Sequence, residues 1–287
     1  MTNIDTSAEV AGALEEGRGV VALESTVIAH GLPHPRNLQV ARELEDEVRA
    51  QGAVPATVGV VGGRPIVGLS AADVERLGTA EGVLKLSTRD LAVPVARGLD
   101  GATTVAATMW LANRAGVAVF ATGGIGGVHR GYAHDVSADI TELGRTAMVV
   151  VCAGAKAILD LPATREALET AGVLIAGYGT HELPAFYSRE SGLTVDVRAD
   201  TAEEVAALWR AHRALAAPGA ILLCVPPPEA HALPAADVEA AIRDALEAAD
   251  AQGVRGKAVT PFLLSAVAER TGGRSLEANV ALLRNNA

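Results

Sequence analysis

Short apolar runs alternate with segments of helical periodicity along most of the chain. The apolar, β-branched runs predict buried strands over 19–23, 56–61, 65–69, 83–87, 117–121 and 219–225 and around positions 149 and 173. Apolar residues at helical spacing predict helices over 37–51, 103–115, 201–215, 234–251 and 261–270, and from 275 to the end. The pair Gly62-Gly63 turns one strand into the next, and a long glycine-rich loop spans roughly 123–138.

Strands and helices alternate through the first two thirds of the chain, and the last third is mainly helical. This order predicts an α/β protein of three layers, α/β/α, with a central mixed, largely parallel sheet and a helical C-terminal third. Three consecutive prolines at 226–228 form the best candidate for a domain boundary, but no linker, repeat or low-complexity tract accompanies them. We therefore expect a single domain over residues 1–287.

Composition narrows the class of protein. The 287 residues carry a formal net charge of −10, only 3% are aromatic, and no cluster of lysine and arginine is present. These features argue against binding to a nucleic acid polymer or to an anionic membrane surface. Two cysteines in apolar runs indicate buried free thiols in a reducing compartment, and the N-terminus lacks the pattern of a signal peptide. With no apolar stretch long enough to span a bilayer, we expect a cytoplasmic protein.

Lys156 is the only charged residue between Arg145 and Asp160. The apolar run before it predicts a buried strand, and the small residues at 153–155 predict the exit of that strand. Because an ammonium group is costly in a dry environment, such a position favours the neutral amine, a nucleophile that forms Schiff bases with carbonyl carbons. The alternative is a lysine that extends to water or pairs with a carboxylate.

Glu24 follows the first buried strand directly. Catalytic groups project from strand ends in α/β sheets, so this carboxyl group is a candidate general acid or base with a raised pKa. A helix or loop cap is the alternative.

Lys85 lies inside another apolar strand and is followed by Arg89. Together with the later pair Thr103-Thr104 these residues could form an anion site, in which lysine supplies a point charge and hydroxyl groups supply hydrogen bonds. The alternative is a surface pair between Arg89 and Asp90.

The glycine-rich loop contains neither a complete GxGxxG fingerprint nor a Walker lysine, so it does not indicate any particular nucleotide cofactor. Its glycines permit close approach of the backbone to a ligand, and His129 and Arg130 within it could bind phosphate. A purely structural loop remains the alternative.

Asp135, Ser137 and Asp139 have oxygen side chains at every second position, which in an extended segment point to one face. Two carboxylates and a hydroxyl group suit Mg²⁺ or Mn²⁺, whereas the lack of nearby thiols or paired histidines disfavours zinc. The alternative is a helix that starts at Asp139. Taken together, a nucleophilic lysine, an acid and an anion or metal site suit a phosphorylated sugar.

At this point the residues become recognisable. The chain closely resembles the pseudouridine-5′-phosphate glycosidase family, also called the indigoidine-synthase-A-like family. The matching segments follow the family in order over nearly the whole chain, at 22–33, 55–60, 85–91, 101–109, 122–131, 135–140, 152–160, 177–187 and 275–282.

The resemblance implies cleavage of the C–C glycosidic bond of pseudouridine 5′-phosphate with water, giving uracil and ribose 5-phosphate. It also implies a homotrimer with an α/β/α fold and one Mn²⁺ ion per subunit, with Mg²⁺ or another divalent ion as a possible substitute. By match to the family, Lys156 is the nucleophile that forms an imine with ribose C1′, Glu24 is the proton donor and Asp135 belongs to the metal site. The expected substrate-binding residues are Lys85, Val105, His129, Ser137, Ala138, Asp139 and Asn279.

Three departures from the family pattern are expected to lie near the site, so phosphate affinity or base preference could differ. The loop between His129 and Asp135 is shorter than expected, Thr88 stands where a second arginine is common, and His181 replaces a usual acidic residue. Two alternatives to the expected activity stay open: a C-glycosidase that acts on another base, and a non-catalytic sensor of sugar phosphates. Retention of Glu24, Asp135 and Lys156 argues against the sensor.

Overall fold

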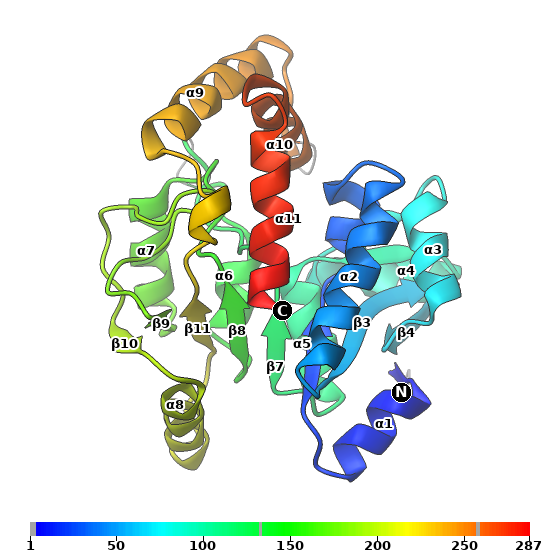
Figure 1. The fold of residues 1–287 in the computed structure, drawn as a ribbon. Helices are drawn as coiled ribbons and strands as arrows, with labels where there is room; N and C mark the ends of the chain where they lie inside the picture. The colour runs from blue at the N-terminus through cyan, green and yellow to red at the C-terminus, as the bar shows by residue number, and fades with distance from the viewer. Residues whose placement is uncertain (1–3, 132–133, 257–258) are drawn as a thin grey trace.

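The computed structural model describes residues 4–131, 134–256 and 259–287 (Figure 1). Within them, the strands join in one eleven-stranded sheet. Its main path runs β1 (Asp5–Thr6), β4 (Arg64–Val67), β3 (Val54–Val61), β2 (Val20–Leu23), β7 (Val119–Ala121), β8 (Val149–Cys152), β11 (Ile221–Cys224), β9 (Leu174–Tyr178) and β10 (Val197–Ala199). β5 (Leu84–Leu86) pairs with β6 (Gly101–Thr103), which joins the sheet at β3.

The sheet is mixed and largely parallel, as predicted. β3 is antiparallel to β4, through the Gly62-Gly63 turn, and to β6, whereas the other pairs that the structure describes along the path are parallel. Every residue of β3 is buried, because strands in this central position have covered faces on both sides. The apolar runs of the sequence therefore correspond to the central strands.

Helices cover both faces of the sheet (Figure 1). The α-helices over the first part of the chain are α1 (Ala8–Glu15), α2 (Arg36–Ala50), α3 (Ala71–Thr79), α4 (Ala92–Arg97) and α5 (Val105–Arg114). Those that follow are α6 (Ala138–Leu143), α7 (Leu161–Thr170), α8 (Ala202–Ala214), α9 (Ala235–Ala251), α10 (Val259–Arg270) and α11 (Arg274–Asn286). A π-helix at Val27–Gly31 and two short 3₁₀ turns at Thr88–Asp90 and Glu229–His231 complete the helical segments of the described residues.

The buried faces of α2 and α5 explain why both helices could be predicted from the sequence. α2 buries Leu38, Ala41, Leu44 and Val48, which share one face of the helix, against the sheet. α5 is buried over most of its circumference, because it packs against β2, β3 and β4. Its predicted start is two positions early, since residues up to Thr103 pair with β5 as the strand β6.

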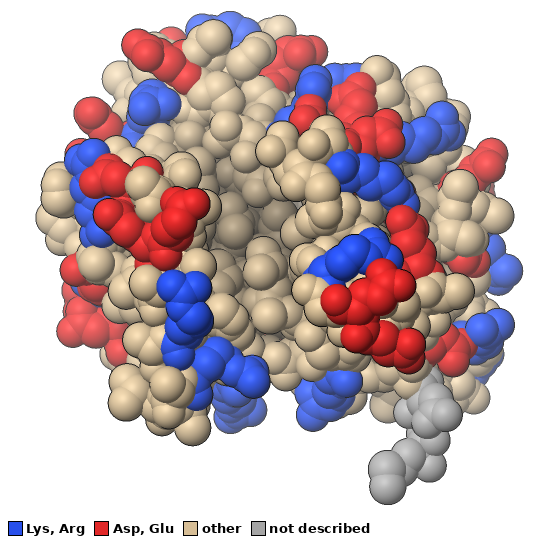
Figure 2. Space-filling view, turned by 60° about the horizontal axis from the view of Figure 1, so that its bottom comes forward, with Lys and Arg blue, Asp and Glu red and all other residues tan. Residues whose placement is uncertain are grey.

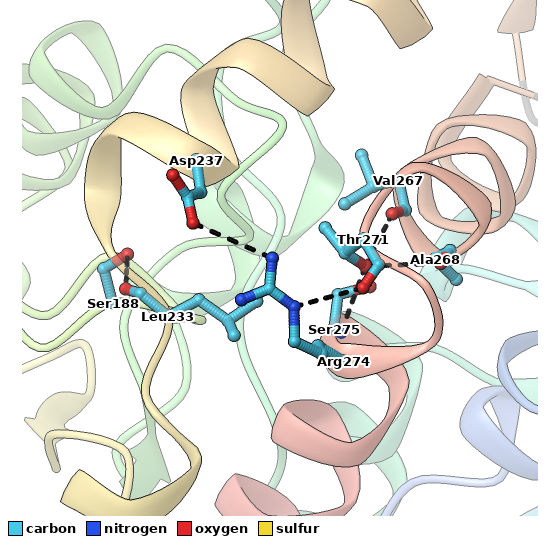
Figure 3. A network of polar contacts seen from close by, with 8 residues as sticks. All are labelled: Ser188, Leu233, Asp237, Val267, Ala268, Thr271, Arg274 and Ser275. Carbon is cyan, nitrogen blue, oxygen red and sulfur yellow. Dashed lines mark hydrogen bonds and ion pairs between the residues drawn. The ribbon is translucent and has the colours of Figure 1, made fainter.

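The C-terminal helices form a connected unit. α9 and α10 pack on each other at one end of the molecule, and α11 runs back across the middle of the sheet (Figure 1). At the turn between α10 and α11, the Thr271 hydroxyl group donates to the Val267 carbonyl at 2.8 Å and lies 3.1 Å from the Ser275 hydroxyl group (Figure 3). Arg274, in the same view, reaches toward Asp237 of α9. This polar network fixes where α11 begins.

Cys152 and Cys224 are both buried and free, as predicted, and they face each other on the paired strands β8 and β11. In the part of the chain that the structure describes, no helix combines the length and the apolar character required to cross a bilayer. On the face drawn in Figure 2, acidic and basic residues are interspersed around an uncharged central hollow, without a broad patch of one sign.

Candidate active site

The expected site residues meet in one cavity of about 560 Å³. All ten of them line it: Glu24, Lys85, Val105, His129, Asp135, Ser137, Ala138, Asp139, Lys156 and Asn279. The cavity lies at the carboxyl ends of the strands, since Glu24 follows β2, Gly123 follows β7 and Lys156 follows β8. This is the edge at which open α/β sheets bind ligands, and the volume is in the range of small-molecule sites.

Glu24 is an almost fully buried acid, with 9% of its surface exposed. Burial raises the pKa of Glu24 because it penalises the carboxylate, while the Lys156 charge and the hydrogen bond from Thr122 act in the opposite direction. The Thr122 hydroxyl group donates to Oε1 of Glu24 at 2.5 Å. The Glu24 carboxyl group is therefore fixed by Thr122, and it retains its proton at a higher pH than an exposed glutamate does.

A hydroxyl network fixes the backbone around Glu24. The hydroxyl group of the next residue, Ser25, donates to the Val58 carbonyl at 2.6 Å and accepts from the backbone N–H of Thr103 at 2.9 Å. Thr103 donates to the same carbonyl at 2.7 Å, so its side chain serves the core. The expectation of Thr103 as part of an anion site is therefore wrong, because its hydroxyl group is committed to buried strands.

Lys156 stands on a tight turn beyond β8 and is half-buried. Its backbone N–H donates to the Ile125 carbonyl, and its own carbonyl accepts from the N–H of Leu159, each at 3.0 Å. Just before it, Gly154 has φ of +84°, and a Cβ atom there would lie 2.2 Å from the carbonyl oxygen of Pro184. Only glycine fits this position, so the small residues before Lys156 are required by the path of the chain.

The glycine-rich loop packs tightly against its own neighbours. A Cβ atom at Gly126 would lie 2.3 Å from the Ser137 hydroxyl group. The Gly126 N–H donates to Oδ2 of Asp139 at 2.8 Å, while Oδ1 accepts from the N–H of Ala106 on α5 at 2.9 Å. Glycine lets these three segments approach each other closely.

The structure corrects the expectation of an extended segment from Asp135 to Asp139. Ser137 is the N-cap of α6, and Asp139 lies in its first turn with both carboxylate oxygens bonded to backbone N–H groups. The alternative of a helix start at this point is confirmed. Asp139 thus holds the glycine loop and α5 together through both of its carboxylate oxygens.

Lys85, Ser87 and Thr104 form a polar end of the cavity. Lys85 and Ser87 share a strand face, and Thr104 follows the register pair Leu86–Thr103. The hydroxyl oxygens of Ser87 and Thr104 are buried without a partner among the described residues. Buried polar atoms are rarely unpaired, so these point to a ligand with hydrogen-bonding groups.

His30 is a site residue that sequence reasoning missed. It lies on the π-helix, lines the cavity, and its Nε2 is buried without a partner in the described structure. Burial lowers the pKa of His30, and the Lys85 charge acts in the same direction, whereas hydrogen bonding to the carbonyls of Leu84 and Val83 raises it. π-Helical turns are frequent at functional sites, but the 3.6-residue pattern gives no signal for them.

His129 and Asp135 lie opposite each other at the neck of one loop, where the His129 N–H donates to the Asp135 carbonyl at 2.9 Å. Burial lowers the pKa of His129, the Asp135 charge raises it, and Lys85 and Lys156 lower it further. The shortened loop between these residues includes positions 132–133, which lie outside the described residues.

The donor set suits only a water-rich metal site. Among the described residues, no cluster of three or more His, Cys, Asp or Glu side chains is placed to hold a metal. Asp135 is exposed and offers a carboxylate to the cavity. A hard ion that keeps several waters and binds one carboxylate together with phosphate oxygens fits this arrangement.

Four other residues that the sequence singled out lie in different places. Asn279 reaches the cavity from α11. Arg89 also lines it, although its guanidinium group lies 3.8 Å from Asp90 in the expected surface pair. His181 lies elsewhere, in a shallow hollow beside β10 and α8, so the expectation that it is near the site is wrong. Thr88 begins a 3₁₀ turn and is absent from the described residues that line the cavity.

The fold and the cavity define an α/β protein with a buried acid, a half-buried lysine and unpartnered hydroxyl groups in one ligand site. The chain belongs to the indigoidine synthase A-like family, whose model matches residues 9–287. A pseudouridine-5′-phosphate glycosidase from Chloroflexus aurantiacus is 63% identical over 97% of this chain and 93% of that protein. A protein of the same name from Herpetosiphon aurantiacus is 57% identical over 100% and 95%.

Two solved structures are similar over nearly the whole chain. The prealnumycin C-glycosynthase AlnA in complex with ribulose 5-phosphate has a TM-score of 0.90 and 44% identity, covering 98% of this chain and 92% of that chain. An indigoidine synthase A-like protein from Thermotoga maritima also has a TM-score of 0.90, with 37% identity over the same shares. Fold and family are thus established together.

Proposed function

We propose that this protein is an enzyme, a pseudouridine-5′-phosphate glycosidase (pseudouridylate synthase), that reversibly cleaves the C–C glycosidic bond of pseudouridine 5′-phosphate in nucleotide catabolism. The products are uracil and ribose 5-phosphate. Full-length relatives with this name share 53–63% identity with the chain. The structural observation that carries the proposal is the meeting of Glu24, Lys156 and the Lys85 end in one cavity.

The C–C bond explains why a lysine is required. Uracil is bonded through carbon, so no heteroatom leaving group is released by simple protonation. Opening the sugar breaks the C1′–O4′ bond as O4′ takes a proton from Glu24, which leaves C1′ electrophilic. The amine of Lys156 then forms a bond to C1′ and gives one proton to the Glu24 carboxylate, which restores the acid.

Glu24 is the proton donor in the next step. Its proton goes to uracil C5 as the C1′–C5 bond breaks, and the nitrogen lone pair of Lys156 forms the C=N bond of an imine. Water then hydrolyses the imine, which releases ribose 5-phosphate and restores the amine. A buried carboxyl group with a raised pKa keeps the required proton to a higher pH than an exposed glutamate does.

The polar end of the cavity suits the phosphate. Lys85 supplies positive charge, and the unpartnered hydroxyl groups of Ser87 and Thr104 supply donors that a phosphate oxygen would satisfy.

Replacing Thr104 with valine, which has nearly the same shape, tests this assignment. We expect KM for pseudouridine 5′-phosphate to rise about 10-fold, the cost of one hydrogen bond to a charged group, with kcat changed less than about 3-fold. Pseudouridine without phosphate serves as the control substrate, because its KM should not respond to the substitution. Equal effects on both substrates would contradict the assignment.

A divalent ion, Mn²⁺ by family resemblance with Mg²⁺ as a possible substitute, would be held at Asp135 with water and phosphate oxygens as the remaining ligands. Its contribution would be to neutralise negative charge on the substrate. This proposal is supported by the exposed carboxylate of Asp135 at the cavity.

The variant Asp135→Asn should weaken Mn²⁺ binding by about 10-fold or more, since the amide removes the charge that attracts a hard cation. Calorimetric titration with Mn²⁺ in the presence of ribose 5-phosphate measures this. Asp200→Asn, an exposed carboxylate outside this cavity, is the matched control. Unchanged Mn²⁺ affinity in Asp135→Asn would remove Asp135 from the metal site.

The homotrimer and the cytoplasmic location stay predictions. Buried free thiols and a phosphorylated substrate support the cytoplasm. Sedimentation velocity of the purified protein tests the trimer.

A second candidate is a C-glycosidase that acts on another base. It is favoured by the 44% identity to a C-glycosynthase solved with ribulose 5-phosphate. Incubation of the protein with pseudouridine 5′-phosphate and Mn²⁺ separates the two. Release of uracil supports the main proposal, whereas release of a different base from another C-nucleotide, with none from this substrate, supports the alternative.

A further inference from the structure

Arg130 is oriented away from the ligand site. Its neighbour His129 lines the cavity, but Arg130 is not among the described residues that do so. The expectation that Arg130 binds phosphate is therefore wrong, and its guanidinium group must be explained in another way.

All three nitrogen atoms of the guanidinium group have partners. Nε donates to the Leu159 carbonyl at 3.0 Å and Nη2 to the Ala157 carbonyl at 3.1 Å. Nη1 donates to Oε1 of Glu239 on α9 at 2.6 Å. The planar fork of arginine suits this set, because it presents several N–H groups in fixed directions.

The two carbonyls belong to the turn that carries Lys156. That turn is closed by the Leu159 N–H, which donates to the Lys156 carbonyl. Ala157 and Leu159 are buried, with 4% and 2% of their surfaces exposed, so carbonyls deprived of Arg130 would lose partners that water does not readily replace.

We propose that Arg130 is the positioning residue for Lys156: it clamps the turn so that the amine is held in the cavity that contains Glu24. This inference rests on the proposed function for its catalytic meaning, but the clamp itself is a statement about geometry. Lysine in place of Arg130 keeps the charge and loses the fork, so it removes the clamp selectively.

Arg165 offers a matched control. It also donates to a backbone carbonyl, that of Thr194, and pairs with two carboxylates, Glu169 and Asp196. It is more buried than Arg130 and is not among the described residues that line the cavity. Arg165→Lys therefore reports the general cost of replacing such an arginine.

The experiment compares Arg130→Lys with Arg165→Lys in two measurements. The first is turnover of pseudouridine 5′-phosphate, where we expect kcat to fall about 10-fold or more in Arg130→Lys with KM within about 3-fold, the pattern of a misplaced reacting group. The second is the rate at which acetic anhydride labels Lys156, followed by mass spectrometry. It should change about 3-fold or more in Arg130→Lys, since the amine leaves its fixed position. Arg165→Lys should match wild type in both.

The labelling rate requires no turnover, so it separates this inference from the proposed function. Wild-type labelling of Lys156 in Arg130→Lys, or the same change in Arg165→Lys, would overturn the clamp. An increase in KM alone would return Arg130 to a phosphate-binding role. If wild-type protein releases no uracil but labelling differs as expected, the proposed function fails while the clamp stands.

Discussion

Replacing Lys156 with alanine is expected to abolish release of uracil, with a loss of about 10⁴-fold or more in kcat, as for loss of the nucleophile in other enzymes with covalent intermediates. The amine is the only group in the proposed reaction that bonds to C1′, so neither Glu24 nor water can replace it. Binding of ribose 5-phosphate should persist, because the Lys85 end of the cavity is intact.

Lys156→Arg is the informative companion variant. Arginine keeps the positive charge, but its guanidinium group stays protonated and forms no imine. If Lys156 acts only by electrostatic attraction, the arginine variant should retain activity within about 10-fold of wild type. We expect it to be as inactive as the alanine variant. Borohydride should also trap ribose 5-phosphate on the wild-type protein at Lys156, and failure to label this residue during turnover would refute the imine route.

Replacing Glu24 with glutamine is expected to lower kcat by about 10²–10⁴-fold, the usual contribution of a general acid. Glutamine has nearly the same shape and still accepts the hydrogen bond that Thr122 donates, so the cavity should be preserved. A pH–rate profile of the wild type should show activity falling as Glu24 loses its proton, above the range of an ordinary glutamate. A Glu24→Gln variant with wild-type kcat would assign proton donation to another residue.

Replacing Glu24 with glutamine lowers kcat, but it is expected to raise the stability of the folded protein relative to the wild type. Because the pKa of Glu24 is raised above its ordinary value of 4.5, the folded protein binds this proton more tightly than the unfolded chain does. The resulting stabilisation is fully present below that value and is lost as the pH rises through the folded pKa. Glutamine is neutral at every pH, so the Tm of Glu24→Gln should rise relative to that of the wild type as the pH increases above 4.5.

Thermal melts of both proteins at several pH values measure this difference. Glu75→Gln is the control, because its carboxylate is exposed and its neutralisation removes no buried charge. A difference in Tm between Glu24→Gln and the wild type that does not grow with pH would contradict the burial argument for Glu24.

Much of the architecture could be read from local patterns. The alternation of apolar runs with amphipathic helices is a local property, and it gave the central strands and the long helices α2, α8 and α9 close to their observed bounds. Among the elements that were missed, α1 has eight residues, β1 has two, and β6 exists because β3 and β5 lie on either side of it. Local propensity carries little information about such segments.

The candidate site was likewise predicted only in part from the sequence. The sequence by itself singled out two candidates for the chemistry. Lys156 is isolated among apolar residues, and Glu24 ends a strand, features that follow from the order of residues along the chain. Only the tertiary structure decided where the other polar side chains point. Asp139 accepts hydrogen bonds from two backbone N–H groups, and Arg130 donates hydrogen bonds to the turn that carries Lys156. His30 lines the cavity from a π-helix. The physical reason is that a side chain's direction depends on its turn geometry and on hydrogen-bonding partners far away in the chain, which no local pattern specifies.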